Sequence, residues 1–225
     1  MGMAWFRKTA ELAARFRLPM WGLCVLAVFL NMLAPMFFRG FLWIPLFLDS
    51  VFTAAVTFAF GLVPGMFVAV FSWLVQCLYW GRFHFFVVCG IAEVLLIFAL
   101  KPAAPVIPYY ASKDRIVATY TGFVAGLMIL YLVCAIAVSV LGGIIDYATR
   151  LFLGIHLHYI SPEDAFRSAL IMADLPLVVE NILARVPVNL ADRFVVVFGG
   201  YFVSRGFVRL ARRRGRTPTV PTASR

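Results

Sequence analysis

Two acidic residues, Asp49 and Glu93, lie inside long runs of apolar side chains. An ionised carboxylate at membrane depth is costly unless a charged or hydrogen-bonding partner compensates it, so such residues are candidates for function by default. We expect them to contact a solute or to couple to a proton. The alternative is structural: each carboxylate pairs with an arginine or a hydroxyl group and only fixes the packing of the helices.

The last apolar segment of the chain combines polar residues with glycine on one face. Its residues recur at steps of three and four, the spacing of a single helix face: Asn189, Asp192, Arg193, Val196, Gly199 and Gly200. A helix that contacts only lipid does not need such a face. We therefore interpret Asp192 and Arg193 either as contacts for a polar solute or as a pair that locks this helix to its surroundings.

Small residues recur every four positions, which lets transmembrane helices approach closely. One set lies along the second and third apolar runs and the turn between them: Ala55, Ala59, Gly61, Gly65 and Ala69. Another lies in the fifth run: Ala118, Gly122 and Gly126. These positions are expected to pack against partner helices, either within the bundle or in another subunit.

Other residue types that could carry chemistry lack the spacing that the chemistry requires. His156 and His158 alternate in a polar segment, but no third metal ligand follows at a convincing distance. The four cysteines lie in apolar runs and are interpreted as small packing residues. No nucleophile, phosphate-binding or dinucleotide-binding motif occurs. We therefore predict no enzyme activity, no cofactor and no metal site.

The composition determines the class of protein that must position these residues. The chain has 225 residues, of which 64% are hydrophobic and 13% are charged. A soluble domain is about 45–50% apolar and about 25% charged. A water-soluble fold of this size cannot bury so much apolar surface, so most of the chain must contact lipid. This excludes a disordered chain, a nucleic-acid-binding domain and a small module built on disulfides.

The apolar runs predict an all-α integral membrane protein, a bundle of six transmembrane helices over residues 18–209. A helix that crosses the hydrocarbon core needs about 20 residues, and six runs approach or reach that length: 18–38, 41–60, 64–80, 83–100, 119–142 and 189–208. Residues 1–17 are expected to form a basic amphipathic helix on the cytoplasmic surface. Residues 146–188 are expected to form a loop or helix that caps the outer side.

The positive charges predict the orientation of the bundle. The formal net charge is +10, and basic residues cluster before the first run and in the tail, residues 210–225. Cytoplasmic segments of membrane proteins are enriched in lysine and arginine. We therefore place both termini in the cytoplasm, with membrane lipid and not nucleic acid as the partner of the basic ends.

Four segments resemble one known family. They are residues 46–55 (LFLDSVFTAA), 60–65 (FGLVPG), 141–147 (LGGIIDY) and 185–201 (RVPVNLADRFVVVFGGY). Their sequences and order are similar to those of the substrate-binding S components of energy-coupling-factor transporters, and of membrane sensor modules built on the same fold. As an order of elements, the likeness covers residues 18–210.

The resemblance implies a six-helix bundle in a bacterial inner membrane, with both ends in the cytoplasm, that binds a vitamin-like solute near its outer face. Such a subunit works with a transmembrane coupling subunit and two ATPase subunits. By position, the implied solute contacts are Asp146, Tyr147, Asn189, Asp192 and Arg193. The alternative function is a sensor or regulatory module on the same scaffold that does not transport.

One feature departs from the family pattern. The family often has an Ala-xxx-Ala row on its first helix for docking to the coupling subunit, whereas the first run here offers only Ala27 and Ala34. The nearest such row is Ala55 and Ala59 on the second run. The sequence therefore does not identify the surface that docks to the coupling subunit.

Overall fold

The computed structural model describes residues 17–40, 46–81, 83–103, 113–153, 170 and 175–214. All regular secondary structure in these residues is helical. The elements are α2 (Arg17–Gly40), α3 (Val51–Phe60), α4 (Leu62–Trp80), α5 (Val87–Leu100), α6 (Lys113–Leu153), α8 (Leu177–Phe194), the π-helical turn η1 (Val195–Gly199) and α9 (Gly200–Arg214).

Four helical stretches are long and apolar enough to cross a membrane: Met20–Phe38, Leu62–Trp80, Asp114–Thr149 and Leu177–Ala211. The last of these joins α8, η1 and α9 into one continuous helix. The helices α3 and α5 are apolar but shorter, with 10 and 14 residues. The prediction of a helical protein with several helices able to cross a membrane is therefore confirmed for the described residues. The count of six spans stays a prediction.

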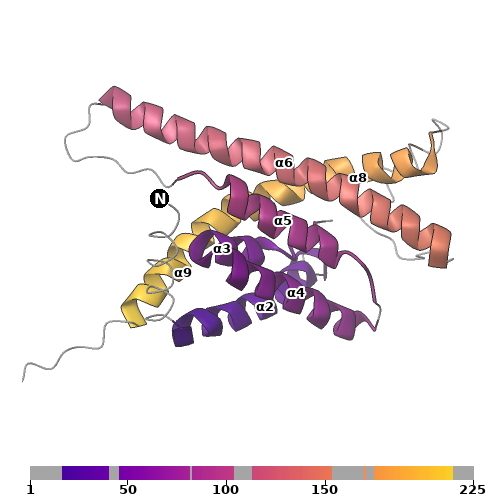
Figure 1. Ribbon diagram of the computed structural model, residues 1–225, viewed down its shortest axis with the longest axis horizontal. Coiled ribbons are helices and arrows are strands. Elements are labelled where there is room, and N and C mark those ends of the chain that lie inside the picture. The colour runs from indigo at the N-terminus through magenta and orange to yellow at the C-terminus, as the bar shows by residue number, and fades with distance from the viewer. Residues whose placement is uncertain are drawn as a thin grey trace, which may run out of the picture.

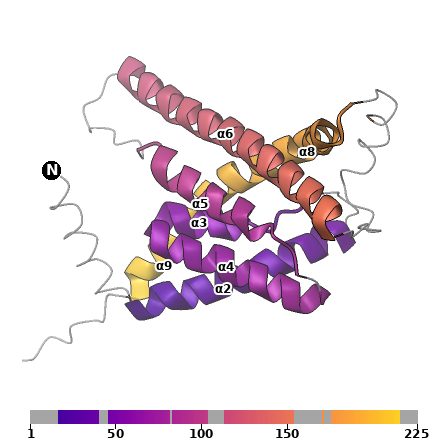
Figure 2. The same ribbon diagram turned by 45° about the vertical axis from the view of Figure 1, so that its right-hand side comes forward.

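The helices form a bundle in which α6 crosses the continuous α8–α9 helix (Figure 1). Turning the molecule shows α2 and α4 side by side on the face away from α6, with α3 and α5 in between (Figure 2). One apolar cluster joins α2, α3, α4 and α9: Met20, Cys24, Ala27, Val28, Ala55, Val56, Val68 and Phe207. A second joins α3, α5, α6 and η1: Ala54, Ile97, Leu127, Leu130, Cys134, Val196 and Val197.

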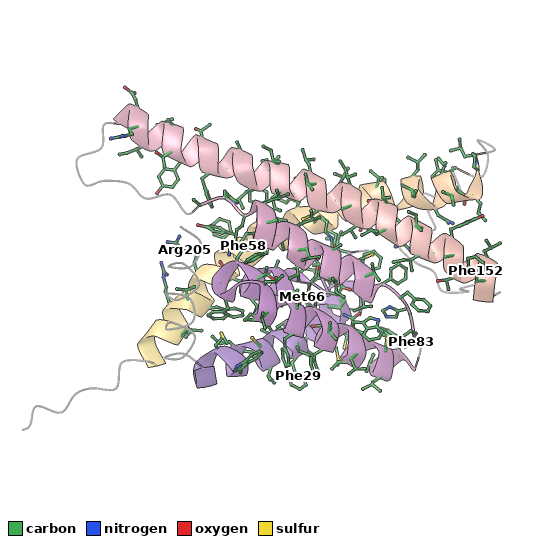
Figure 3. The ribbon with its side chains drawn as sticks, in the orientation of Figure 1. Phe29, Phe58, Met66, Phe83, Phe152 and Arg205 are labelled. Atoms are coloured by element: carbon green, nitrogen blue, oxygen red, sulfur yellow. The ribbon has the colours of Figure 1, made fainter. Side chains whose placement is uncertain are left out.

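The outer surface of the bundle is itself apolar. Phe29 on α2 is 57% exposed and Phe152 on α6 is 79% exposed, and both point away from the neighbouring helices (Figure 3). Soluble proteins rarely expose many large apolar side chains together. This surface therefore suits lipid. The four cysteines are buried and free, as expected for packing residues.

The two ends of the bundle differ in what they bring together. At one end, Met20 near the start of α2 packs in the same cluster as Phe207 near the end of α9. At the other end, the C-terminal part of α6 crosses the N-terminal part of α8 (Figure 1), with Gly143 close to Ile182. We call these the terminal end and the α6–α8 end.

The second predicted span, 41–60, differs from the structure. Residues 46–50 are not helical, and α3 begins only at Val51. Leu48 adopts a left-handed backbone conformation with φ of 47°, which a right-handed helix cannot accommodate. Asp49 therefore lies before a helix and not inside one. Residues 41–45 lie outside the described part of the chain.

The later boundaries differ as well. The last helix was expected to start at Asn189, but α8 begins at Leu177 and Pro187 lies within it. Proline interrupts helices by removing a hydrogen bond, yet neighbouring helices compensate for this in membrane bundles, and α8 packs along α6. Helix α6 runs from Lys113 to Leu153, beyond the predicted 119–142. Asp146 and Tyr147 therefore lie on this long helix.

Several predicted features fall on residues that the structure does not describe. These are the amphipathic helix as far as residue 16, most of the proposed cap between residues 154 and 174 including His156 and His158, and the tail beyond residue 214. They stay predictions.

Asn31 on α2 joins three helices through its buried side chain. Its Nδ2 donates to Thr53 Oγ1 at 2.8 Å and to Ser72 Oγ at 3.1 Å, while its Oδ1 accepts from the backbone N–H of Phe52 at 2.9 Å. The first N–H groups of a helix have no partner within the helix. Asn31 thus caps the start of α3 from a neighbouring helix, although the sequence analysis gave it no role.

We expect Asn31→Leu to lower the free energy of unfolding by about 1–3 kcal/mol, because it leaves the partly buried Phe52 N–H without an acceptor. Thermal unfolding of the detergent-purified protein measures the change. Leu33→Ala, at an exposed position on the same helix, is the control and should change stability by less than about 0.5 kcal/mol. Equal effects of both substitutions would contradict the capping role.

Candidate functional site

Arg193, near the end of α8, is the centre of a buried network of charged side chains. Its Nη1 donates to Glu93 Oε2 and, at 2.8 Å, to Ser50 Oγ. Its Nη2 donates to Asp192 Oδ2 at 2.7 Å and lies 3.9 Å from Asp49 Oδ1. We call Asp49, Ser50, Glu93, Asp192 and Arg193 the Arg193 cluster.

Three parts of the chain supply this cluster: α5, α8 and the non-helical segment 46–50. The segment is held by Asp192, whose Oδ1 accepts from the backbone N–H of Leu48 at 2.7 Å. A left-handed backbone at a residue with a side chain is unfavourable and persists only where the surroundings impose it. The hydrogen bond from Leu48 to Asp192 supplies such a constraint, and it brings Asp49 and Ser50 to Arg193.

The cluster is buried to different degrees. The side chains of Glu93 and Asp192 are 1% and 0% exposed, whereas that of Asp49 is 35% exposed. Asp49 is therefore the part of the cluster that can be approached from outside. In the buried part, Glu93 Oε1 and Arg193 Nε have no hydrogen-bond partner.

A second group of polar side chains lies between α6 and α8, towards the α6–α8 end. Arg185 Nη2 is 4.0 Å from Asp146 Oδ2, and the guanidinium lies over the ring of Phe86, 4.9 Å from its centroid. Further along the same interface, Asn189 Nδ2 donates to Ser139 Oγ at 3.0 Å. These contacts help to hold the two helices together.

The structure thus divides the predicted solute contacts. It brings Asp49, Glu93, Asp192 and Arg193 into one cluster, in which the carboxylates of Asp49 and Glu93 both contact Arg193. Asn189 and Asp146 instead lie in the α6–α8 interface. Tyr147 is partly buried on α6 next to Asp146.

Two participants in the Arg193 cluster were not predicted from the sequence: Ser50 and the backbone of Leu48. Arg185, which was expected near Asp192 and Arg193, belongs to the α6–α8 interface. Ser50 lies inside the predicted span 41–60, whereas in the structure it immediately precedes α3. Serine is a common helix cap, but the Ser50 hydroxyl accepts from Arg193 and makes no cap hydrogen bond.

The small-residue row on the second and third runs packs inside the bundle. Ala55 and Ala69 are buried, and Ala59 packs beside the first apolar cluster. A Cβ on Gly65 would collide with the Thr57 side chain. Gly61 forms the turn between α3 and α4 with a left-handed φ of 94°, a conformation that favours glycine. In these contacts, the row serves internal packing.

Comparison of the chain with protein-family models, curated proteins and solved structures finds no match. The function must therefore be argued from the site itself. In the described part of the chain, no group of three or more histidine, cysteine, aspartate and glutamate side chains is arranged to hold a metal ion. The Arg193 cluster offers instead fixed charges, a carboxylate oxygen without a hydrogen-bond partner (Glu93 Oε1) and a partly exposed side chain, that of Asp49.

Proposed function

We propose that this chain is the solute-binding membrane subunit of an uptake transporter of the energy-coupling-factor type. It binds a small organic nutrient near the outer face of a bacterial inner membrane and passes it inward. The observation that carries the proposal is the Arg193 cluster, a set of charged side chains buried inside an apolar bundle. Charged groups at such positions are rare and mark pathways or binding sites for polar solutes.

The position of the cluster along the bundle supports a site near the outer face. Arg193 and Arg209 lie on the same continuous helix, and 16 residues of helix separate them by about 24 Å. If the arginine-rich end of α9 lies at the cytoplasmic surface, the cluster lies in the outer half of a hydrocarbon core about 30 Å thick. The second polar group, Asp146 and Arg185, lies still further towards the α6–α8 end.

The full arrangement that we propose has six spans, both termini in the cytoplasm, and an outer cap between α6 and α8. The short helices α3 and α5 complete the six spans. A coupling subunit with its two ATPases supplies the energy for uptake, since no ATP-binding motif occurs in this chain.

Purification of the tagged protein from its native membrane tests this proposal. We expect a transmembrane coupling subunit and two ATPase subunits to copurify, and mass spectrometry to detect a small organic molecule released on denaturation. A tagged membrane protein without transport function is the control. Recovery of a kinase or a cyclase without ATPases would instead favour the sensor function. Recovery of neither solute nor ATPases would contradict uptake.

A further inference from the structure

The charges of the Arg193 cluster do not balance. In the described part of the chain, Arg193 is the one cation in ion-pair contact with Asp49, Glu93 and Asp192. Three carboxylates therefore share one guanidinium. The hydrogen bond that the Leu48 N–H donates to Asp192 stabilises this carboxylate further, but it adds no positive charge.

Glu93 is the member of the cluster beside which an additional positive charge would be most stabilising. Its side chain is 1% exposed and its Oε1 has no hydrogen-bond donor, although its Oε2 is bound to Arg193. An ionised carboxylate in an apolar interior is stable only when it is paired and its oxygens are hydrogen-bonded. The open oxygen of Glu93 therefore needs a donor, and the cluster needs positive charge.

Asp49 marks the side of the cluster from which a hydrogen-bond donor can approach Glu93. It is the exposed member of the cluster, and it lies within 4 Å of the same guanidinium as Glu93. A group that enters beside Asp49 thus meets two carboxylates whose charge Arg193 does not fully compensate. In the described part of the chain, no three such side chains are arranged to hold a metal ion, which favours an organic cation over a metal ion.

We infer that the solute carries a cationic nitrogen group, an ammonium or an amidinium, which binds between the carboxylates of Asp49 and Glu93. The group donates hydrogen bonds to Glu93 Oε1 and to Asp49, and its charge neutralises the surplus of the cluster. This inference rests on the proposed function and adds the chemical class of the solute to it. The competing explanation is that protons neutralise the surplus carboxylates, and then no cation is required.

Butylammonium chloride and uncharged butan-1-ol are matched probes, used with the full-length protein in nanodiscs and with sodium chloride at equal ionic strength as the reference. We expect butylammonium, but not butan-1-ol, to bind and to raise the unfolding temperature. Asp49→Asn should weaken butylammonium binding at least about tenfold, since it removes a charged hydrogen-bond acceptor. Asp114→Asn, at an exposed position at the start of α6, is the control and should leave the affinity unchanged.

The Glu93→Gln variant distinguishes neutralisation of the cluster by a cationic solute from neutralisation by protons. If protons neutralise the cluster, glutamine mimics the neutral acid, and the variant binds butylammonium as the wild type does or neither binds it. Either outcome overturns the inference. If Glu93→Gln does not fold, Asp49→Asn decides alone.

The solute that copurifies with the protein distinguishes this inference from the proposed function. A solute with a cationic nitrogen supports both. A neutral or anionic solute, recovered with the ATPases, overturns the inference and leaves the proposed function standing. The absence of any solute and of the ATPases overturns the proposed function.

Discussion

Replacement of Arg193 by glutamine is expected to lower the free energy of unfolding by about 3–5 kcal/mol, the typical cost of removing one partner from a buried ion pair. The substitution removes the guanidinium from Glu93 and Asp192, which are almost completely buried. It also removes the donor to Ser50 Oγ. The carboxylates are then left without a counter-charge.

Unfolding of the purified variants with increasing SDS, followed by circular dichroism, measures this effect. Arg209→Gln, at an exposed position on α9, is the control and should change stability by less than about 0.5 kcal/mol. In the Arg193→Gln background, Glu93→Gln should restore about 1–2 kcal/mol, because it removes one unpaired buried charge and the two substitutions act on one network. Simple additivity of the two losses would show that the guanidinium does not compensate Glu93.

Replacement of Gly143 by valine is expected to lower the free energy of unfolding by about 3 kcal/mol, the upper end of the range for overpacking. A Cβ at this position of α6 would lie 2.8 Å from the Cα and 2.9 Å from the backbone N of Ile182 on α8. Backbone atoms cannot move aside as the end of a side chain can, so the two helices must separate. The contacts of Asp146 with Arg185 and of Asn189 with Ser139 lie in the same interface and would be lengthened.

Gly122→Val is a matched control on the same helix, because a Cβ at Gly122 meets no atom within 4 Å. The same unfolding assay should show little loss, or a slight gain, since valine has a higher helix propensity than glycine. If Gly143→Val and Gly122→Val behaved alike, the close approach of α6 and α8 would not contribute to stability.

The four charged members of the Arg193 cluster were predicted from the sequence one by one, but the contacts between them were not. Charges in apolar runs single out Asp49 and Glu93, and helical spacing singles out Asp192 and Arg193. Glu93 and Arg193 are 100 residues apart, and Ser50 and Arg193 are 143 apart. Periodicity tells which face of a helix is polar, but it does not tell which helix that face meets.

The predicted helix boundaries were wrong for a related reason. Hydropathy does not distinguish a helical from a non-helical apolar segment, and residues 46–50 read as part of a span. The break is imposed from elsewhere in the chain, since Asp192 accepts the N–H of Leu48. Pro187 had the opposite effect on the prediction: it indicated a helix end where α8 continues, because a helix that is packed along its length tolerates a proline. Asn31 was overlooked because uncharged polar residues interrupt an apolar run only weakly.

The unequal helix lengths have a consequence for the surrounding bilayer. The candidate spans on α2 and α4 have 19 residues each, whereas the candidate span on α6 has 36. At 1.5 Å per residue these stretches measure about 29 Å and about 54 Å. A hydrocarbon core of about 30 Å matches the first two when they stand nearly upright, but it matches α6 only at a strong inclination. The crossing of α6 over the bundle (Figure 1) thus lets helices of different lengths share one membrane thickness.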